Sequence, residues 1–174
     1  MPDILDMPAG CRIDADLGVA KVQIGGGADT PQRLAAALGL GAPAPNRYSE
    51  NGSIALSAIA PGEWLLTGPA DAVATALGYV DETFQEDVVL ALDLTHGRTA
   101  LRFEGPAGQA CLAALTPLDL RPDRFPVGAA VRTRLGDIGA FVARTGDAPA
   151  FLLIVDQSYT DYVLHLIGHA ANAA

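Results

Sequence analysis

The same order of secondary-structure elements occurs twice in this sequence of 174 residues, and that repeat limits the fold more than any other feature. In the first half, an alternating apolar segment at 19–24 ends at a glycine run and precedes a helical segment that begins at Thr30 and Pro31. In the second half, the alternating segment R-T-A-L-R-F at 98–103 precedes a Gly-Pro and an alanine-rich helical segment. A hairpin and a second helix are expected to follow in each half. The sequence therefore predicts an α+β fold built by internal duplication of a strand–helix–hairpin–helix unit, with mixed or antiparallel sheets covered by helices.

We expect one domain, because a chain of this length that is 50% hydrophobic and 18% charged can bury a sizeable core without disulfides. Residues 1–17 are acidic and aperiodic, which predicts an extended lead. The first repeat is expected at 18–80 and the second at 88–170. Residues 88–92 and 151–155 are near-continuous apolar runs, which are typical of central strands.

Trp64 is the only tryptophan, and it lies beside two leucines in a short strand after the turn signal Pro61-Gly62. This position favours a core role, with an anchor for a partner protein as the alternative. The alignment of the two halves places Phe151 at the corresponding position. We therefore expect both aromatic side chains to be buried.

The net charge of −9 disfavours nucleic acid and anionic membrane surfaces as partners, since both are polyanions. Residues 1–96 carry 13 acidic and 4 basic side chains, whereas residues 97–174 carry 7 of each. Ten of the eleven basic residues are arginines. The second half would therefore present a guanidinium-rich surface suited to carboxylates or phosphates. Five of its seven arginines are Arg98, Arg102, Arg132, Arg134 and Arg144, and the alternative is that they are ordinary solvated side chains on strand faces.

The two cysteines, Cys11 and Cys111, are too few for a disulfide framework and have no metal-ligand spacing. Reduced thiols are expected, with Cys111 acting as a small core residue. The first residues lack the basic and apolar regions of a secretory signal, and no run approaches the roughly 18 apolar residues of a membrane span. These features predict a cytoplasmic protein.

No catalytic, cofactor-binding or metal-binding residue is predicted, because the chain has no nucleophile elbow and no metal signature. Asp161, His165 and His169 follow a helical spacing that could hold a metal, but histidines near a helix C-terminus have a simpler electrostatic explanation. His96, at a strand break beside Arg98, is the one histidine in a position typical of a functional site, with hydrogen bonding to local carbonyls as the alternative.

Five segments carry a resemblance to a known family. They are D-L-T-H-G-R-T-A-L-R-F-E-G-P-A, T-P-L-D-L, a following F-P-x-G, T-R-L-G, and L-L-I-V-D-Q-S-Y-T-D-Y. Together they resemble the γ subunits of bacterial heterotetrameric sarcosine oxidases, from about Pro61 to the end of the chain, and P-L-D-L and D-x-S-Y are the most specific elements.

The resemblance implies a non-catalytic structural or assembly subunit of a complex that demethylates sarcosine to glycine. It also implies that FAD, FMN, NAD and tetrahydrofolate belong to larger flavoprotein subunits, and that this chain holds none of them. We expect the partner interface to involve His96, Arg98, Arg102, Arg132 and Arg134.

The γ-subunit family is in turn similar to the folate-binding domain of glycine-cleavage aminomethyltransferases, a duplicated α+β domain. That family has an acidic G-G-x-x-D-D segment, whose acidic pair falls at about Val142 and Ala143 in this chain. Apolar side chains cannot orient a folate amine or move a proton. Two alternatives to the γ subunit stay open, namely a stand-alone folate-binding protein similar to aminomethyltransferases and a self-associating module of unrelated function.

Overall fold

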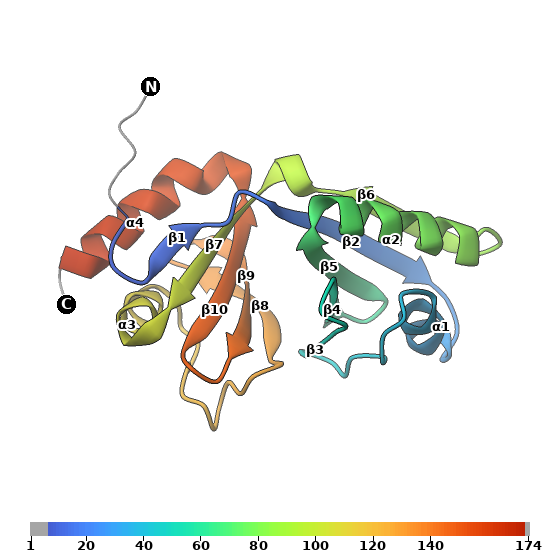
Figure 1. Cartoon of the computed structure of the whole chain (residues 1–174), viewed down its shortest axis with the longest axis horizontal. Coiled ribbons are helices and arrows are strands. Elements are labelled where there is room, and N and C mark those ends of the chain that lie inside the picture. The colour runs from blue at the N-terminus through green and yellow to red at the C-terminus, as the bar shows by residue number, and fades with distance from the viewer. Residues whose placement is uncertain (1–6, 173–174) are drawn as a thin grey trace. The chain divides into compact units, whose positions relative to one another are not determined.

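The structure is a computed structural model that describes residues 7–172, and its chain forms two compact units (Figure 1). The inserted unit comprises Asp16–His96. The terminal unit combines the described residues before Asp16 with those from Gly97 onward. The chain therefore passes between the units twice, after Ala15 and after His96.

The inserted unit is a five-stranded antiparallel sheet with two helices, α1 and α2, and its strand order is β3-β4-β5-β2-β6. Pro61 and Gly62 join β4 to β5 in the hairpin expected from the sequence. The elements in chain order are β2 (Leu17–Gly25), α1 (Thr30–Ala37), β3 (Tyr48–Glu50), β4 (Ala55–Ala60), β5 (Glu63–Pro69), α2 (Ala70–Thr83) and β6 (Val88–Asp93).

The terminal unit contains a second five-stranded antiparallel sheet, in the order β1-β7-β10-β9-β8. Helices α3 and α4 belong to this unit, and the 3-10 turn η1 (Thr95–Gly97) leads into it. The remaining elements in chain order are β1 (Cys11–Ile13), β7 (Arg98–Glu104), α3 (Gly105–Leu115), β8 (Ala130–Leu135), β9 (Ile138–Gly146), β10 (Ala150–Asp156), the 3-10 turn η2 (Gln157–Tyr159) and α4 (Thr160–Asn172).

Each unit has its own hydrophobic core between sheet and helices. In the inserted unit Trp64 is only 3% exposed and packs with buried side chains such as Leu66 and Phe84. In the terminal unit Phe151 is fully buried with Phe103. The expected core roles of Trp64 and Phe151 are therefore confirmed, as is the α+β class with antiparallel sheets.

The two sheets share one strand order when β3, β4, β5, β2 and β6 are placed on β8, β9, β10, β7 and β1. In this correspondence the early strand β1 occupies the position in the terminal unit that β6 occupies in the inserted unit. Such a match is what a duplication would produce, and the common origin of the halves stays a prediction, as do the repeat boundaries at 18–80 and 88–170.

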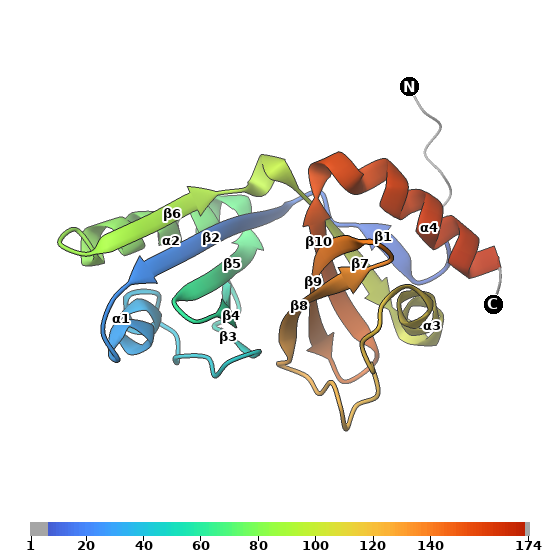
Figure 2. The same ribbon diagram turned by 180° about the vertical axis from the view of Figure 1, so that it is seen from behind.

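The prediction that residues 88–92 form a central strand is wrong. Strand β6 is the edge of its sheet (Figure 2), and Val88, Leu90 and Leu92 are 82%, 44% and 41% exposed. Residues 151–155 do lie centrally, because β10 is paired on both sides. An apolar run indicates that a segment can be buried on both faces, but the number of its strand neighbours depends on the rest of the sheet.

The segment 1–17, predicted to be an extended lead, contains strand β1, whose Cys11 is paired in register with Phe103. Three residues are too short for an alternation to be recognised in the sequence. The expected core role of Cys111 is confirmed, and Cys11 is buried in the same cluster. A hydrogen bond with Cys111, together with burial, raises the pKa of the Cys11 thiol.

Candidate functional site

The turn that carries His96 is fixed by polar contacts at the exit from β6. A carboxylate oxygen of Asp93 accepts a hydrogen bond of 2.8 Å from the backbone N–H of Thr95. This contact is the main reason that the pKa of Asp93 is lowered. The Thr95 hydroxyl in turn accepts a hydrogen bond of 3.1 Å from the N–H of Val19 in β2. The His96 side chain is exposed at the point where the chain leaves the inserted unit.

Arg98 and Arg102 lie on β7, and each is paired with a carboxylate of this same chain. Arg98 forms an ion pair with Asp156, its cross-strand neighbour in β10. The Nε of Arg102 donates to Asp14 over 2.8 Å, and both side chains are about one-fifth exposed. These pairs leave little unbalanced positive charge for a carboxylate or phosphate ligand.

Arg132 and Arg134 lie on β8, where both are exposed and share one face as the alternation predicts. Arg134 forms an ion pair of 3.2 Å with Asp137 in the following turn. The register places the arginines of β7 and β8 on the same face of the sheet. Because β10 and β9 lie between these strands, the two groups are separated by three strand spacings, or about 14 Å. The predicted interface residues therefore form two separate groups and not one cluster.

Arg144 differs from the expectation of a surface guanidinium, because its residue is only 3% exposed. Its guanidinium donates hydrogen bonds of 3.2 to 3.4 Å to carbonyl oxygens, and it lies 5.5 Å from the centroid of the Phe151 ring. The carbonyls belong to Leu120, Phe125, Gly146 and Asp147. Arg144 thus attaches the loop with the T-P-L-D-L and F-P-x-G segments to the end of β9.

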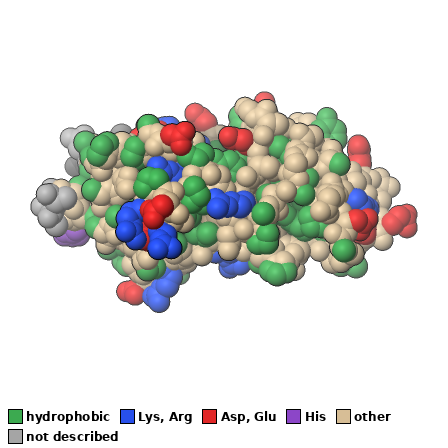
Figure 3. Space-filling view, turned by 90° about the horizontal axis from the view of Figure 1, so that it is seen from below, with side chains coloured by type: hydrophobic (Ala, Val, Ile, Leu, Met, Phe, Trp, Pro, Cys, Tyr) green, Lys and Arg blue, Asp and Glu red, His purple; other side chains and the backbone are tan. Residues whose placement is uncertain are grey.

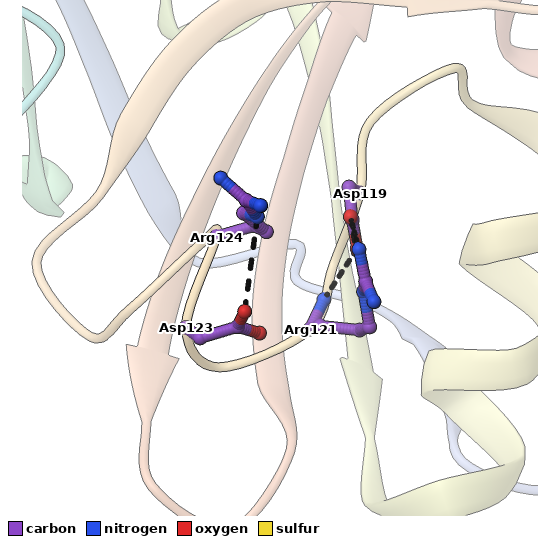
Figure 4. A network of polar contacts seen from close by, with 4 residues as sticks. All are labelled: Asp119, Arg121, Asp123 and Arg124. Carbon is purple, nitrogen blue, oxygen red and sulfur yellow. Dashed lines mark hydrogen bonds and ion pairs between the residues drawn. The ribbon is translucent and has the colours of Figure 1, made fainter.

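The outer side of that loop carries exposed ion pairs (Figure 4). Arg121 donates to both carboxylate oxygens of Asp119, and Arg124 pairs with Asp123 over 3.7 Å. The hydrogen bonds from the Arg121 side chain lower the pKa of Asp119 to about 2. Figure 3 shows basic and acidic side chains intermixed on the face seen from below. Sequence reasoning identified the P-L-D-L segment as a family element but did not predict these pairs.

Neither a metal site nor a membrane helix is found in the part of the chain that the structure describes. No group of three or more His, Cys, Asp or Glu side chains within residues 7–172 is arranged to hold a metal ion. Asp161, His165 and His169 are exposed on α4, and the Nδ1 atom of His165 lies 2.6 Å from the carbonyl oxygen of Asp161. No helix among these residues is both long and apolar enough to cross a bilayer.

Solved structures match this architecture. A chain of the heterotetrameric sarcosine oxidase from Corynebacterium sp. U-96, in complex with pyrrole 2-carboxylate, is 27% identical and superposes with a TM-score of 0.84. The match covers 94% of this chain and 83% of that one. The glycine cleavage system aminomethyltransferase T from Bartonella henselae superposes with a TM-score of 0.68 at 14% identity, covering 92% of this chain and 45% of that one. This second likeness concerns the fold alone.

Sequence comparison gives the same family. The sarcosine oxidase subunit gamma of Corynebacterium sp. (strain U-96) is 31% identical over 134 residues, which are 76% of this chain and 64% of the relative. The chain thus spans less than two thirds of that relative's length. The model of the sarcosine oxidase gamma subunit family matches residues 25–173. The chain therefore belongs to the sarcosine oxidase gamma subunit family.

Proposed function

We propose that this chain is a non-catalytic assembly subunit of a heterotetrameric sarcosine oxidase, in which partner subunits carry out the oxidative demethylation of sarcosine to glycine. The observation that carries the proposal is the match to a chain of the Corynebacterium heterotetramer over most of both chains. In the proposed assembly the partners are larger flavoprotein subunits, and the complex is cytoplasmic. A reducing compartment would keep the neighbouring thiols of Cys11 and Cys111 unlinked.

The fold's likeness to an aminomethyltransferase raises folate binding as a second function, and the residues present do not fit it. In the alignment we expect from the sequence, the acidic pair of that family falls at about Val142 and Ala143, and both residues are buried in β9. Neither side chain can accept a proton or hydrogen-bond an amine. We therefore assign tetrahydrofolate, FAD, FMN and NAD to the partner subunits in this proposal.

Co-expression tests the proposal directly. A tagged form of the chain is expressed with the larger flavin-containing subunits encoded in the same genome, and the purified material is assayed for stoichiometry, flavin absorbance and sarcosine oxidation. We expect one complex in which all three properties elute together. The tagged chain expressed alone should carry no flavin and oxidise no sarcosine.

Two results would count against the proposal. Purification of the larger subunits as a stable, fully active complex without this chain would remove the assembly role. Heat release on titrating the isolated chain with tetrahydrofolate would favour the folate-binding alternative, and calorimetry measures it without any need for turnover.

A further inference from the structure

Strand β6 is an edge strand without the usual protection of an edge. It pairs with β2 on one side, and on its other side no strand of residues 7–172 is paired with it. Soluble proteins commonly protect such edges with lysine, proline, a bulge or a very short strand. The six residues V-V-L-A-L-D contain neither lysine nor proline, and their register with β2 runs without a shift.

The corresponding edge strand of the other sheet provides a comparison within the same chain. Strand β1 has three residues, and its middle residue Arg12 is 55% exposed and paired with Glu104 over 3.2 Å. A short strand with a charged side chain resists the addition of another strand. Of these two edges, the β6 edge is therefore the one suited to pairing with an additional strand.

The side chains of β6 are apolar on both faces of the sheet. Val88, Leu90 and Leu92 form the outer row and are exposed, beside Gly25, Gln23 and Lys21 of β2. Val89 and Ala91 are half-buried on the opposite face, against the core that contains α2. A strand added at this edge would place its own side chains beside the outer row on one face and beside Val89 and Ala91 on the other, which is the geometry of recognition by strand addition.

The negative charge around β6 favours a basic strand of another chain over a second copy of β6. Residues 16–96 carry ten acidic and three basic side chains, a formal charge of −7. Glu86 and Asp87 precede β6, and Asp93 ends it; of these, Asp87 is already paired with Arg33 of α1 over 2.9 Å. Two copies of β6 paired antiparallel would bring the acidic ends of each strand together, which is unfavourable. A basic strand from a different chain would instead meet opposite charge.

We propose that the free edge of β6 binds an extended strand of a larger subunit of the same assembly, with apolar residues at alternate positions and lysine or arginine beyond its ends. This inference rests on the proposed function, because it takes the occupant from the heterotetramer. The backbone of β6 supplies hydrogen bonds for affinity, and the row of Val88, Leu90 and Leu92 supplies specificity.

The double variant Val88→Asp/Leu90→Asp tests the proposal in the co-expressed complex. Both side chains point to the outer face, so the core of the inserted unit is kept. We expect at least a tenfold loss of affinity for the larger subunits, measured by surface plasmon resonance. Hydrogen–deuterium exchange of the wild-type complex should show the backbone amides of residues 88–93 protected relative to the isolated chain.

The control is Tyr79→Asp, because Tyr79 is 51% exposed on α2, in the helix layer on the other side of the sheet. This variant should bind like the wild type. A wild-type complex that forms while the amides of residues 88–93 stay unprotected would overturn the strand proposal and leave the assembly role standing. A homodimer of the isolated chain that the double variant dissociates would assign the edge to a second copy. If the wild-type chain binds no larger subunit at all, the proposed function itself fails.

Discussion

Arg144 shows how a single buried charge can organise a long loop. Its guanidinium donates to carbonyl oxygens in the loop at Leu120 and Phe125 and in the turn at Gly146 and Asp147. Removing the guanidinium leaves these carbonyls without that donor, and the loss destabilises the fold most at Leu120 and Phe125, whose hydrogen bonds are buried. The loop should therefore be held less firmly to the end of β9, where the backbone hydrogen bonds of residue 144 with Gly128 and Ala129 remain.

We expect Arg144→Leu to lower the free energy of unfolding by about 3 kcal/mol. Urea denaturation followed by circular dichroism measures the change. The matched control is Arg134→Leu, which removes an exposed arginine of the same sheet and should change stability by no more than about 0.5 kcal/mol. Equal losses in the two variants would contradict the structural role of Arg144.

The exposed pair between Asp119 and Arg121 makes a prediction about pH. The pKa of Asp119 is about 2 in the folded chain, below its ordinary value of 3.8, so the ionised form is the one that Arg121 stabilises. The stabilisation of the folded chain by this pair is present above pH 3.8 and is lost as the pH falls through about 2. Titration of the Asp119 carboxyl by NMR should give the low midpoint. The variant Arg121→Gln should return the midpoint toward 3.8, and about 1 M salt should move it the same way in the wild type.

At the scale of elements, helix α3 packs closely against the turn before β1, because Gly108 of the helix and Gly10 of the turn meet at the contact. A Cβ atom built on Gly108 would lie 2.6 Å from the carbonyl oxygen of Gly10 and 2.9 Å from the carbonyl carbon of Phe103. Real Cβ atoms do not approach backbone atoms that closely, so the helix, the turn at Gly10 or β7 would have to move.

Gly108→Ala should therefore destabilise the protein by about 1 to 3 kcal/mol, although alanine is the better helix former. Gly168→Ala in α4 is the control, since a Cβ there meets no atom within 4 Å and should stabilise the helix by up to about 1 kcal/mol. Thermal unfolding should show a lower melting temperature for Gly108→Ala and a higher one for Gly168→Ala than for the wild type. A stabilising Gly108→Ala would mean that α3 does not lie this close to the turn at Gly10 and to β7.

Strands β6 and β10 show why an element's type is easier to predict than its place in a sheet. Both are continuous apolar runs, and both were expected to be central. Strand β10 lies between β7 and β9, and its Leu153 and Val155 are buried. In β6, Leu90 is 44% exposed. The number of hydrogen-bonded neighbours depends on segments elsewhere in the chain, and no local pattern records it.

At the scale of the whole molecule, the two cores share no residue, and Trp64 lies in only one of them. Tryptophan fluorescence should therefore report on the inserted unit, while circular dichroism reports on both units. Leu153 of the terminal unit and Leu66 of the inserted unit are both fully buried leucines on inner strands. They form a matched pair for testing how independently the units unfold.

We expect Leu66→Ala to lower the free energy of unfolding by about 2 to 5 kcal/mol when urea denaturation is followed by Trp64 fluorescence. Leu153→Ala should lower the free energy of unfolding by a similar amount when circular dichroism is the probe. The value obtained from Trp64 fluorescence should change much less. Identical shifts of both probes in both variants would show instead that the chain unfolds as one cooperative unit.

The sequence alone determined the class of the fold, most of its strands and helices, the burial of Trp64 and Phe151, and the resemblance to the γ-subunit family. These follow from local periodicity, turn residues and short motifs, which act over neighbouring positions. Only the tertiary structure decided that β6 is an edge and that β1 pairs with β7. It also decided that Arg144 is buried while Arg98 and Arg102 are paired with carboxylates. Each of these depends on contacts between segments distant in the chain. An arginine in an alternating strand has the same local sequence pattern whether its guanidinium contacts solvent, a carboxylate or a carbonyl oxygen.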